Sequence, residues 1–152
     1  MGIESNISPG ALGTATLIVG EEHTAARVGS GKIGVLATPV MINLFEAAAL
    51  DACEAALPEG HQSLGTQLNV SHAAATPVGM KVTATARVTG VEGRTIHFAL
   101  EARDEVEVIG GGTHERVVVS VAKFDARVQE KRVRAGMVIG KLDPGLRRDD
   151  ND

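Results

Sequence analysis

The chain has 152 residues, of which 43% are hydrophobic and 2% aromatic, and its formal net charge at pH 7 is −4. This size and apolar content support one domain with a single core and are too small for two ordinary domains. The acidic balance and the scarcity of aromatic side chains argue against a nucleic-acid partner. The single cysteine, Cys53, excludes an intrachain disulfide and fits a reducing cytoplasm.

The first residues show neither the basic start nor the apolar run of a secretory signal. No stretch of the sequence reaches the roughly 18 apolar residues that a membrane-spanning helix needs. We therefore expect a cytoplasmic protein with no membrane partner.

The first predicted elements are a strand and a polar segment. A β-branched run predicts a short strand at residues 15–19. Residues 22–35 are polar and contain Gly29, Gly31 and Gly34. This segment is either a mobile lid or a plain connecting loop.

A helix is predicted from residue 38 to about residue 57. Thr38 is a favoured N-cap and Pro39 suits the first helical position, while Pro58 and Gly60 end the segment. Apolar side chains cover most of its surface, so we expect the helix to be largely buried.

Three alternating stretches follow and predict strands with hairpin connections. On the first stretch, the residues that share the inward face are Leu64, Thr66, Leu68, Val70 and His72. The second stretch covers residues 81–88 and the third residues 96–103, with a turn at Glu92 and Gly93 between them. Glycines 110–112 predict a break before a last strand at residues 113–122.

One strand, one buried helix and four further strands predict an α+β protein in which a five-stranded antiparallel sheet wraps around one central helix. This arrangement is the hot-dog fold. We place the domain at residues 1–134, including a charged helical segment at residues 125–134, and expect residues 135–152 to form a disordered tail.

Two side chains of the predicted helix are candidates for chemistry. Thr38 lies at a helix N-terminus, which stabilises negative charge, although a structural cap alone explains a threonine there. Glu46 lies on the apolar face of the helix, where a buried carboxylate costs several kcal/mol unless it is paired. It is a general base or nucleophile, a structural partner of His72 or Arg116, or a group partly exposed at a dimer interface.

His72 points inward by the period of its strand and shares the predicted interior with Glu46. It is either a group that tunes the carboxylate or a satisfied core histidine. The other histidines have no metal-ligand spacing, so neither a metal nor another cofactor is expected. Cys53 fits a small buried hydrophobe, and the G-x-S-x-G motif of α/β-hydrolase thioesterases is absent.

Five features of the sequence resemble one known family. They are V-L-A-T-P at residues 35–39, Glu46 eight residues after Thr38, S-L-G-T at 63–66, H-A-A-A-T-P-V-G-M at 72–80 and I-G-G-G-T-H-E-R at 109–116. In order and spacing they are similar to the fluoroacetyl-CoA-thioesterase-like family of the hot-dog superfamily. The likeness extends over about residues 15–131.

The resemblance implies an acyl-CoA thioesterase that forms a homodimer and binds acyl-CoA near the subunit interface. The implied catalytic residues are Thr38, Glu46 and His72. The implied substrate-binding residues are Gly65, which lines the acyl pocket through its backbone, Thr113 and Arg116.

The resemblance also bears on the substrate. Members that use fluoroacetyl-CoA are expected to close the acyl pocket with an aromatic residue in the lid, and this sequence has no aromatic residue before Phe45. The expected substrate is therefore a broader class of small acyl-CoA thioesters. The alternative is a non-catalytic acyl-CoA-binding or sensing protein on the same fold, and only the enzyme releases free CoA thiol.

Overall fold

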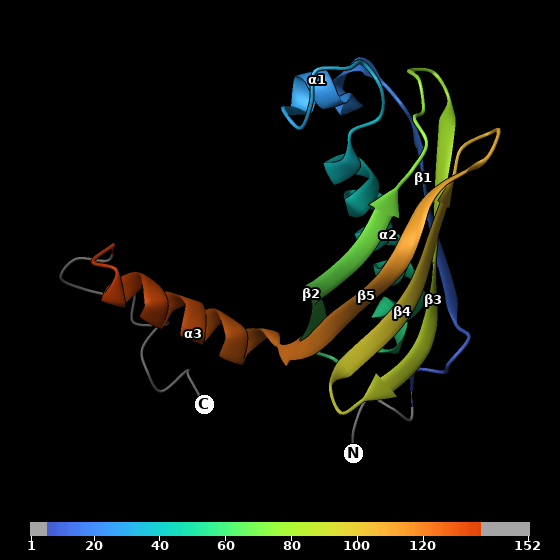
Figure 1. Cartoon of the computed structure of the whole chain (residues 1–152). Helices are drawn as coiled ribbons and strands as arrows, with labels where there is room; N and C mark the ends of the chain where they lie inside the picture. The colour runs from blue at the N-terminus through green and yellow to red at the C-terminus, as the bar shows by residue number, and fades with distance from the viewer. Residues whose placement is uncertain (1–5, 138–152) are drawn as a thin grey trace.

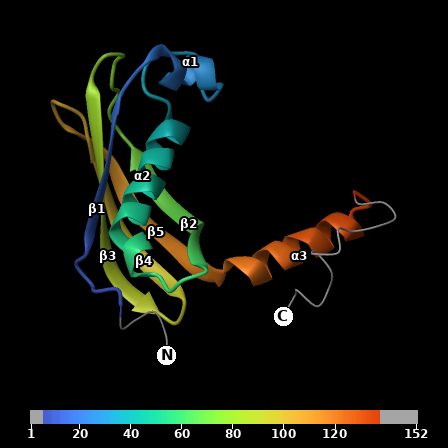
Figure 2. The ribbon, with the colours of Figure 1, turned by 180° about the vertical axis from the view of Figure 1, so that it is seen from behind.

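The computed structural model describes residues 6–137 and has the predicted architecture. The strands are β1 (Leu12–Ile18), β2 (His61–His72), β3 (Lys81–Glu92), β4 (Thr95–Arg103) and β5 (Val108–Ser120). They form one antiparallel sheet in the order β1-β3-β4-β5-β2. The sheet curls around helix α2 (Thr38–Cys53), as Figures 1 and 2 show. The predicted hot-dog fold is confirmed.

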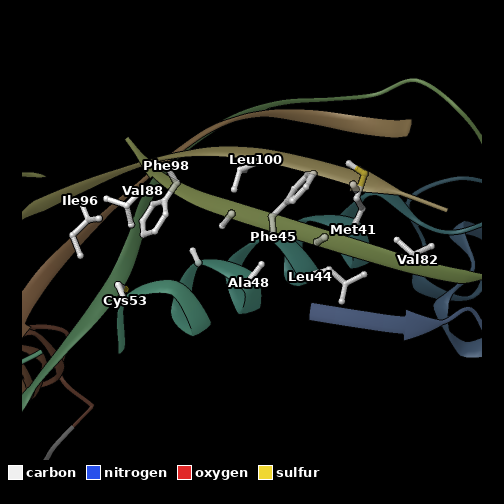
Figure 3. Close-up of a cluster of buried hydrophobic side chains, with 14 of the residues drawn as sticks. Met41, Leu44, Phe45, Ala48, Cys53, Val82, Val88, Ile96, Phe98 and Leu100 are labelled. Atoms are coloured by element: carbon white, nitrogen blue, oxygen red, sulfur yellow. The ribbon is translucent and has the colours of Figure 1, made fainter. Parts of the chain in front are cut away.

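Helix α2 packs its apolar side against the concave face of the sheet (Figure 3). Phe45 of the helix and Phe98 of β4 are the largest fully buried side chains of this core. On the β1 side, Gly13 lets the strand approach the helix backbone, because a Cβ at this position would meet the carbonyl oxygen of Ala48 and the amide nitrogen of Ala52. The helix continues into a 3₁₀ turn, η3 (Glu54–Ala56), and so ends close to the predicted residue 57.

Strand β2 contains a β-bulge that changes which of its side chains face the core. The pairing register with β5 shifts between Gly65 and Gln67, which leaves Thr66 as the extra residue. One inserted residue reverses the alternation of faces. The prediction that Leu64 and Thr66 point inward is therefore wrong, because both are exposed and the buried neighbour is Ser63. Beyond the bulge the predicted inward residues are half-buried: Leu68, Val70 and His72.

Glycines 110–112 lie inside β5, so the predicted break is also wrong. A Cβ on Gly110 would meet the carbonyl oxygen of Ser71 in β2 and would lie 3.0 Å from the sulfur of Met41 in α2. A Cβ on Gly111 would lie 2.7 Å from the carbonyl oxygen of Leu100 in β4. These glycines allow close approach of neighbouring backbones rather than a turn.

The segment before α2 contains two short helices, where the sequence predicted only a polar glycine-rich lid or loop. They are η2 (Glu21–His23) and α1 (Ala25–Val28). The Ala25 amide donates to the Val35 carbonyl oxygen at 2.8 Å, and the Leu36 amide donates to the Thr76 carbonyl oxygen at 2.9 Å. These bonds tie the segment to itself and to the loop after β2, at the α1 end of the sheet (Figure 1).

Helix α3 (Val121–Arg134) follows β5 directly and projects away from the sheet (Figure 1). It begins earlier than the predicted residue 125 because Ser120 is its N-cap, with the hydroxyl accepting from the Lys123 amide at 3.4 Å. The last strand accordingly ends at Ser120 and not at residue 122. Most of the predicted disordered tail, residues 138–152, lies outside the described residues. No helix within the described part of the chain is long and apolar enough to cross a membrane.

Replacing Gly110 by alanine is expected to lower the free energy of unfolding by about 1–3 kcal/mol, because the new methyl group overlaps the backbone of β2. Gly90→Ala is the matched control, since Gly90 also lies in a strand and nothing is within 4 Å of a Cβ built there. Urea denaturation of both variants and the unchanged protein measures the difference. Equal stability of the two variants would contradict the close-packing role of Gly110.

Candidate active site

Thr38 lies in the first turn of α2, and its hydroxyl is directed to His72. The N-cap of the helix is Ala37, whose side chain makes no capping hydrogen bond, and Pro39 follows in the first turn. The prediction of Thr38 as the N-cap is therefore wrong by one residue. Thr38 Oγ1 instead lies 2.7 Å from His72 Nδ1. A structural cap, the simpler explanation of this threonine, does not account for its hydroxyl.

His72 lies at the end of β2, and one of its ring nitrogens is unpaired. Nε2 is buried and has no hydrogen-bond partner among the residues described. Burial lowers the pKa of His72 below the usual 6.5, and an interaction with the backbone of Ala74 opposes this effect. The ring is therefore neutral at pH 7. A satisfied core histidine would have partners for both nitrogens, so the unpaired nitrogen favours a functional role.

A cavity of about 300 Å³ adjoins Thr38 and His72. Its lining comes from the segment between α1 and α2, from the first turn of α2 and from the residues after β2. Most lining side chains are small or aliphatic and none is Phe, Tyr or Trp: Ala25, Ser30, Gly31, Lys32, Ile33, Val35, Leu36, Thr38, His72, Ala73, Ala74 and Ala75. The cavity therefore has room for a small group next to the Thr38–His72 pair.

Glu46 lies about two helical turns beyond Thr38 and pairs with Arg116 of β5. Glu46 Oε2 is 3.4 Å from Arg116 Nη1, and the Glu46 side chain is 37% exposed whereas the Arg116 side chain is 6% exposed. The sequence suggested His72 or Arg116 as a structural partner of Glu46, and the structure shows the ion pair with Arg116. Within residues 6–137 it shows no ion pair between Glu46 and His72. The carboxylate is thus fixed by a cation on one side and accessible on the other.

Arg116 is anchored chiefly by Ser63 of β2. Arg116 Nε donates to Ser63 Oγ at 2.8 Å, and Nη2 donates to the Ser63 carbonyl oxygen at 3.0 Å. A third contact joins Nη1 to His114 Nε2 at 3.3 Å. These contacts satisfy N–H groups of a guanidinium that would otherwise be costly to bury.

Gly65 lies next to the Glu46 carboxylate, at the bulge of β2. A Cβ here would meet Glu46 Oε2 and would lie 3.1 Å from His114 Cε1 and 3.5 Å from Arg116 Nη1. Thr113, by contrast, is exposed on the opposite face of β5, because side chains alternate along a strand and His114 and Arg116 are buried. The structure brings Gly65 together with Glu46 and Arg116, and it does not bring Thr113 to them.

Two residues of this group, Ser63 and His114, were missed as site residues from the sequence. The signal for His114 was present, since it lies two residues before Arg116 and the strand period puts both side chains on one face. Ser63 had no such signal, because the bulge reverses the face that the alternation predicts.

The predicted catalytic residues thus form two groups along α2. Thr38 and His72 adjoin the cavity, whereas Glu46 lies with Gly65 and Arg116 further along the helix. Eight residues of helix separate Thr38 from Glu46 by about 12 Å along the axis. In the part of the chain that the structure covers, no three His, Cys, Asp or Glu side chains are grouped so that they could hold a metal ion.

Comparison with known proteins identifies relatives of the chain. The profile of a family described as fluoroacetyl-CoA-specific thioesterase (FlK) matches residues 19–122. The curated fluoroacetyl-CoA thioesterase of Streptantibioticus cattleyicolor is 46% identical over 97 residues, which cover 64% of this chain and 70% of that relative.

Solved structures agree with the sequence relatives. The fluoroacetyl-CoA thioesterase FlK superposes with a TM-score of 0.77 and 37% identity over 82% of this chain and 97% of that one. A thioesterase superfamily member from Thermus thermophilus superposes with a TM-score of 0.81 and 28% identity over 87% and 98% of the two chains. The family profile covers more than half of the sequence, and the resemblance seen in the motifs is confirmed: this chain belongs to the fluoroacetyl-CoA-specific thioesterase family.

Proposed function

We propose that this protein is a thioesterase that hydrolyses a small acyl-CoA to the free acid and CoA. The observation that carries the proposal is the Thr38–His72 pair beside the cavity. The Thr38 hydroxyl does not cap the helix and instead forms a hydrogen bond with the neutral imidazole of His72. Family membership supports the reaction class. The curated relative is named a fluoroacetyl-CoA thioesterase, and a mutant of a solved relative is in complex with fluoroacetate and CoA.

The proposed reaction begins when water, or the Glu46 carboxylate itself, adds through oxygen to the thioester carbonyl carbon. The C–S bond then breaks, and CoA leaves as a thiolate that takes up a proton. When Glu46 is the nucleophile, this step leaves a covalent acyl intermediate on its carboxylate, and water then hydrolyses that intermediate to the free acid. Glu46 acts as the general base or nucleophile, and Arg116 holds its carboxylate in place. Thr38, His72 and the positive end of α2 orient the thioester and stabilise the negative charge that develops on its oxygen.

The thioester would lie between the two groups of site residues. Thr38 and Glu46 are about 12 Å apart along the helix axis, a separation that the two side chains and the thioester between them have to span. The acyl group or the adjoining part of the CoA arm would fill the cavity of about 300 Å³. Because no Phe, Tyr or Trp lines that cavity, we propose small acyl-CoA thioesters as the substrate class rather than fluoroacetyl-CoA alone. Thr113, on the outer face, has no part in this proposal.

Glu46→Gln tests the role of the carboxylate. CoA release is expected to fall about 100-fold or more, because an amide is neither a base nor a nucleophile. The melting temperature is expected to fall by only a few degrees, since the Glu46–Arg116 pair is partly exposed and Arg116 keeps its bonds to Ser63. The measurement pairs the initial rate of thiol release over a panel of acyl-CoA thioesters with a thermal melt.

Glu54→Gln is the control for this charge change, because Glu54 is exposed at the end of the same helix, and it should leave both quantities unchanged. An unchanged rate in Glu46→Gln, together with a large loss of stability, would make Glu46 only a structural partner of Arg116. If the unchanged protein binds acyl-CoA and releases no thiol, it is a non-catalytic binding protein.

Thr38→Val separates a catalytic hydroxyl from a structural cap. The rate is expected to fall about 100-fold because the hydrogen bond to His72 is lost. Stability should hold, since the N-cap is Ala37 and valine keeps the shape of threonine. Thr38→Ser retains the hydroxyl and should keep most of the activity. A drop in melting temperature with no change in rate per folded molecule would return Thr38 to a purely structural role.

We also propose that the protein is a homodimer joined along β2. Strand β2 is an edge of the sheet, so one row of its backbone N–H and C=O groups faces away from β5, and Leu64 on it is 38% exposed. Soluble proteins usually cover such an edge, and pairing here would place the two sites near the subunit interface. Sedimentation equilibrium should give twice the chain mass at micromolar concentration, and a stable monomer there would exclude the proposal.

A further inference from the structure

His114 is a buried histidine to which the reaction above gives no role. Its side chain lies on the inner face of β5 and the residue is 1% exposed. Its ring stacks on Phe98 of β4, with centroids 5.7 Å apart and an angle of 29° between the planes. Both ring nitrogens have polar neighbours: Nδ1 is 2.9 Å from the Gln67 carbonyl oxygen, and Nε2 is 3.3 Å from Arg116 Nη1.

These two neighbours determine where the proton of His114 resides. A carbonyl oxygen can only accept a hydrogen bond, so Nδ1 must carry the proton that it donates to Gln67. An arginine nitrogen can only donate, so Nε2 must be bare and accept from Arg116. Both contacts therefore require the same neutral form of the ring, with its proton on Nδ1.

The surroundings of the ring also oppose a second proton. Burial, the largest effect, lowers the pKa of His114, and the charge of Arg116 lowers it further. The hydrogen bond to Gln67 and the charges of Glu46 in α2 and Glu115 in β5 raise this pKa. The net effect is a lowered pKa. Phe98, the neighbour from β4, is uncharged. The neutral ring therefore persists at pH 7.

Arg116 Nη1 carries two hydrogens, and the structure offers one acceptor for each. Glu46 Oε2 lies 3.4 Å from this nitrogen and His114 Nε2 lies 3.3 Å from it. The imidazole therefore holds the Nη1 side of the planar guanidinium, in addition to the Ser63 bonds on Nε and Nη2. The other nitrogen of the ring connects to Gln67, the first residue after the β2 bulge. His114 thus joins the backbone next to Gly65 to the arginine that orients Glu46.

We propose that His114 is a positioning residue for thioester hydrolysis, which accepts a hydrogen bond from Arg116 and so holds the guanidinium against the Glu46 carboxylate. This inference rests on the proposed function of Glu46. It requires no proton transfer by His114, because the ring stays neutral and touches no reacting atom.

Two substitutions distinguish this role from simple packing. His114→Phe keeps the ring that stacks on Phe98 and removes both hydrogen bonds, and kcat is expected to fall about tenfold or more while KM changes less than about threefold. His114→Gln has one amide donor and one amide acceptor, so it should recover most of the lost kcat. His97→Phe, on the outer face of β4 where the ring contacts Glu92 and Glu115, controls for a histidine-to-phenylalanine change and should leave kcat unchanged.

A double-mutant cycle then tests whether His114 acts through Arg116. The variant with both Arg116→Met and His114→Phe should be no slower than Arg116→Met alone, because the partner through which His114 acts is already gone. Independent, multiplicative losses would overturn the proposal, as would equal kcat in His114→Phe and the unchanged protein after correction for the folded fraction.

The protonation of the ring gives a test that does not depend on activity. Long-range ¹H–¹⁵N NMR should show a neutral ring that is protonated on Nδ1 at pH 7 and whose signals are lost in His114→Gln, which assigns them to His114. A proton on Nε2, or on both nitrogens, would overturn the inference even in an active enzyme. If the unchanged protein releases no CoA thiol, the proposed hydrolysis fails, and the positioning role for that reaction is overturned with it; the NMR result then reports only on the Arg116 contact.

Discussion

The candidate site depends on the β-bulge at Thr66. Before the bulge, Ser63 is buried and bonded to Arg116, and after it His72 reaches the hydroxyl of Thr38. In a regular strand residues 63 and 72 lie on opposite faces, because they are an odd number of positions apart. Without the extra residue, either Arg116 would lose its anchor or Thr38 would lose its partner. One irregularity thus allows a single strand to serve both groups of site residues.

The buried guanidinium of Arg116 explains much of the remaining arrangement. A cation that is 6% exposed is tolerated only when its N–H groups are paired. Here the partners come from three elements: Ser63 of β2, Glu46 of α2 and His114 of β5. The absence of a side chain at Gly65 leaves room for Glu46 in this group. The position of the carboxylate is therefore set by the sheet as much as by the helix that carries it.

Periodicity and helix signals were sufficient to predict the fold and the central helix. They placed His72 beside Glu46, whereas the structure pairs His72 with Thr38 and Glu46 with Arg116. What they could not predict are features set by contacts between distant segments. The bulge at Thr66 is a property of the pairing with β5 and leaves no mark in the alternation of β2. A run of three glycines, here residues 110–112, favours a turn when only the local sequence is considered. It forms part of a strand because the neighbouring strands lie too close for side chains at these positions. The N-cap lies one residue earlier than predicted, at Ala37, which leaves the Thr38 hydroxyl for a histidine 34 positions away.

The place of β2 at the edge of the sheet has a consequence for the order in which the molecule assembles. Strands β3, β4 and β5 follow one another through short connections, whereas β2 joins β5 across a long separation, as the contact between Ser63 and Arg116, 53 positions apart, illustrates. Closing a loop of that length costs more chain entropy than closing a hairpin. In the isolated chain β2 is also held laterally by one strand only. The site is thus completed only when β2 closes on β5, a slower step than formation of the β3–β4 and β4–β5 hairpins.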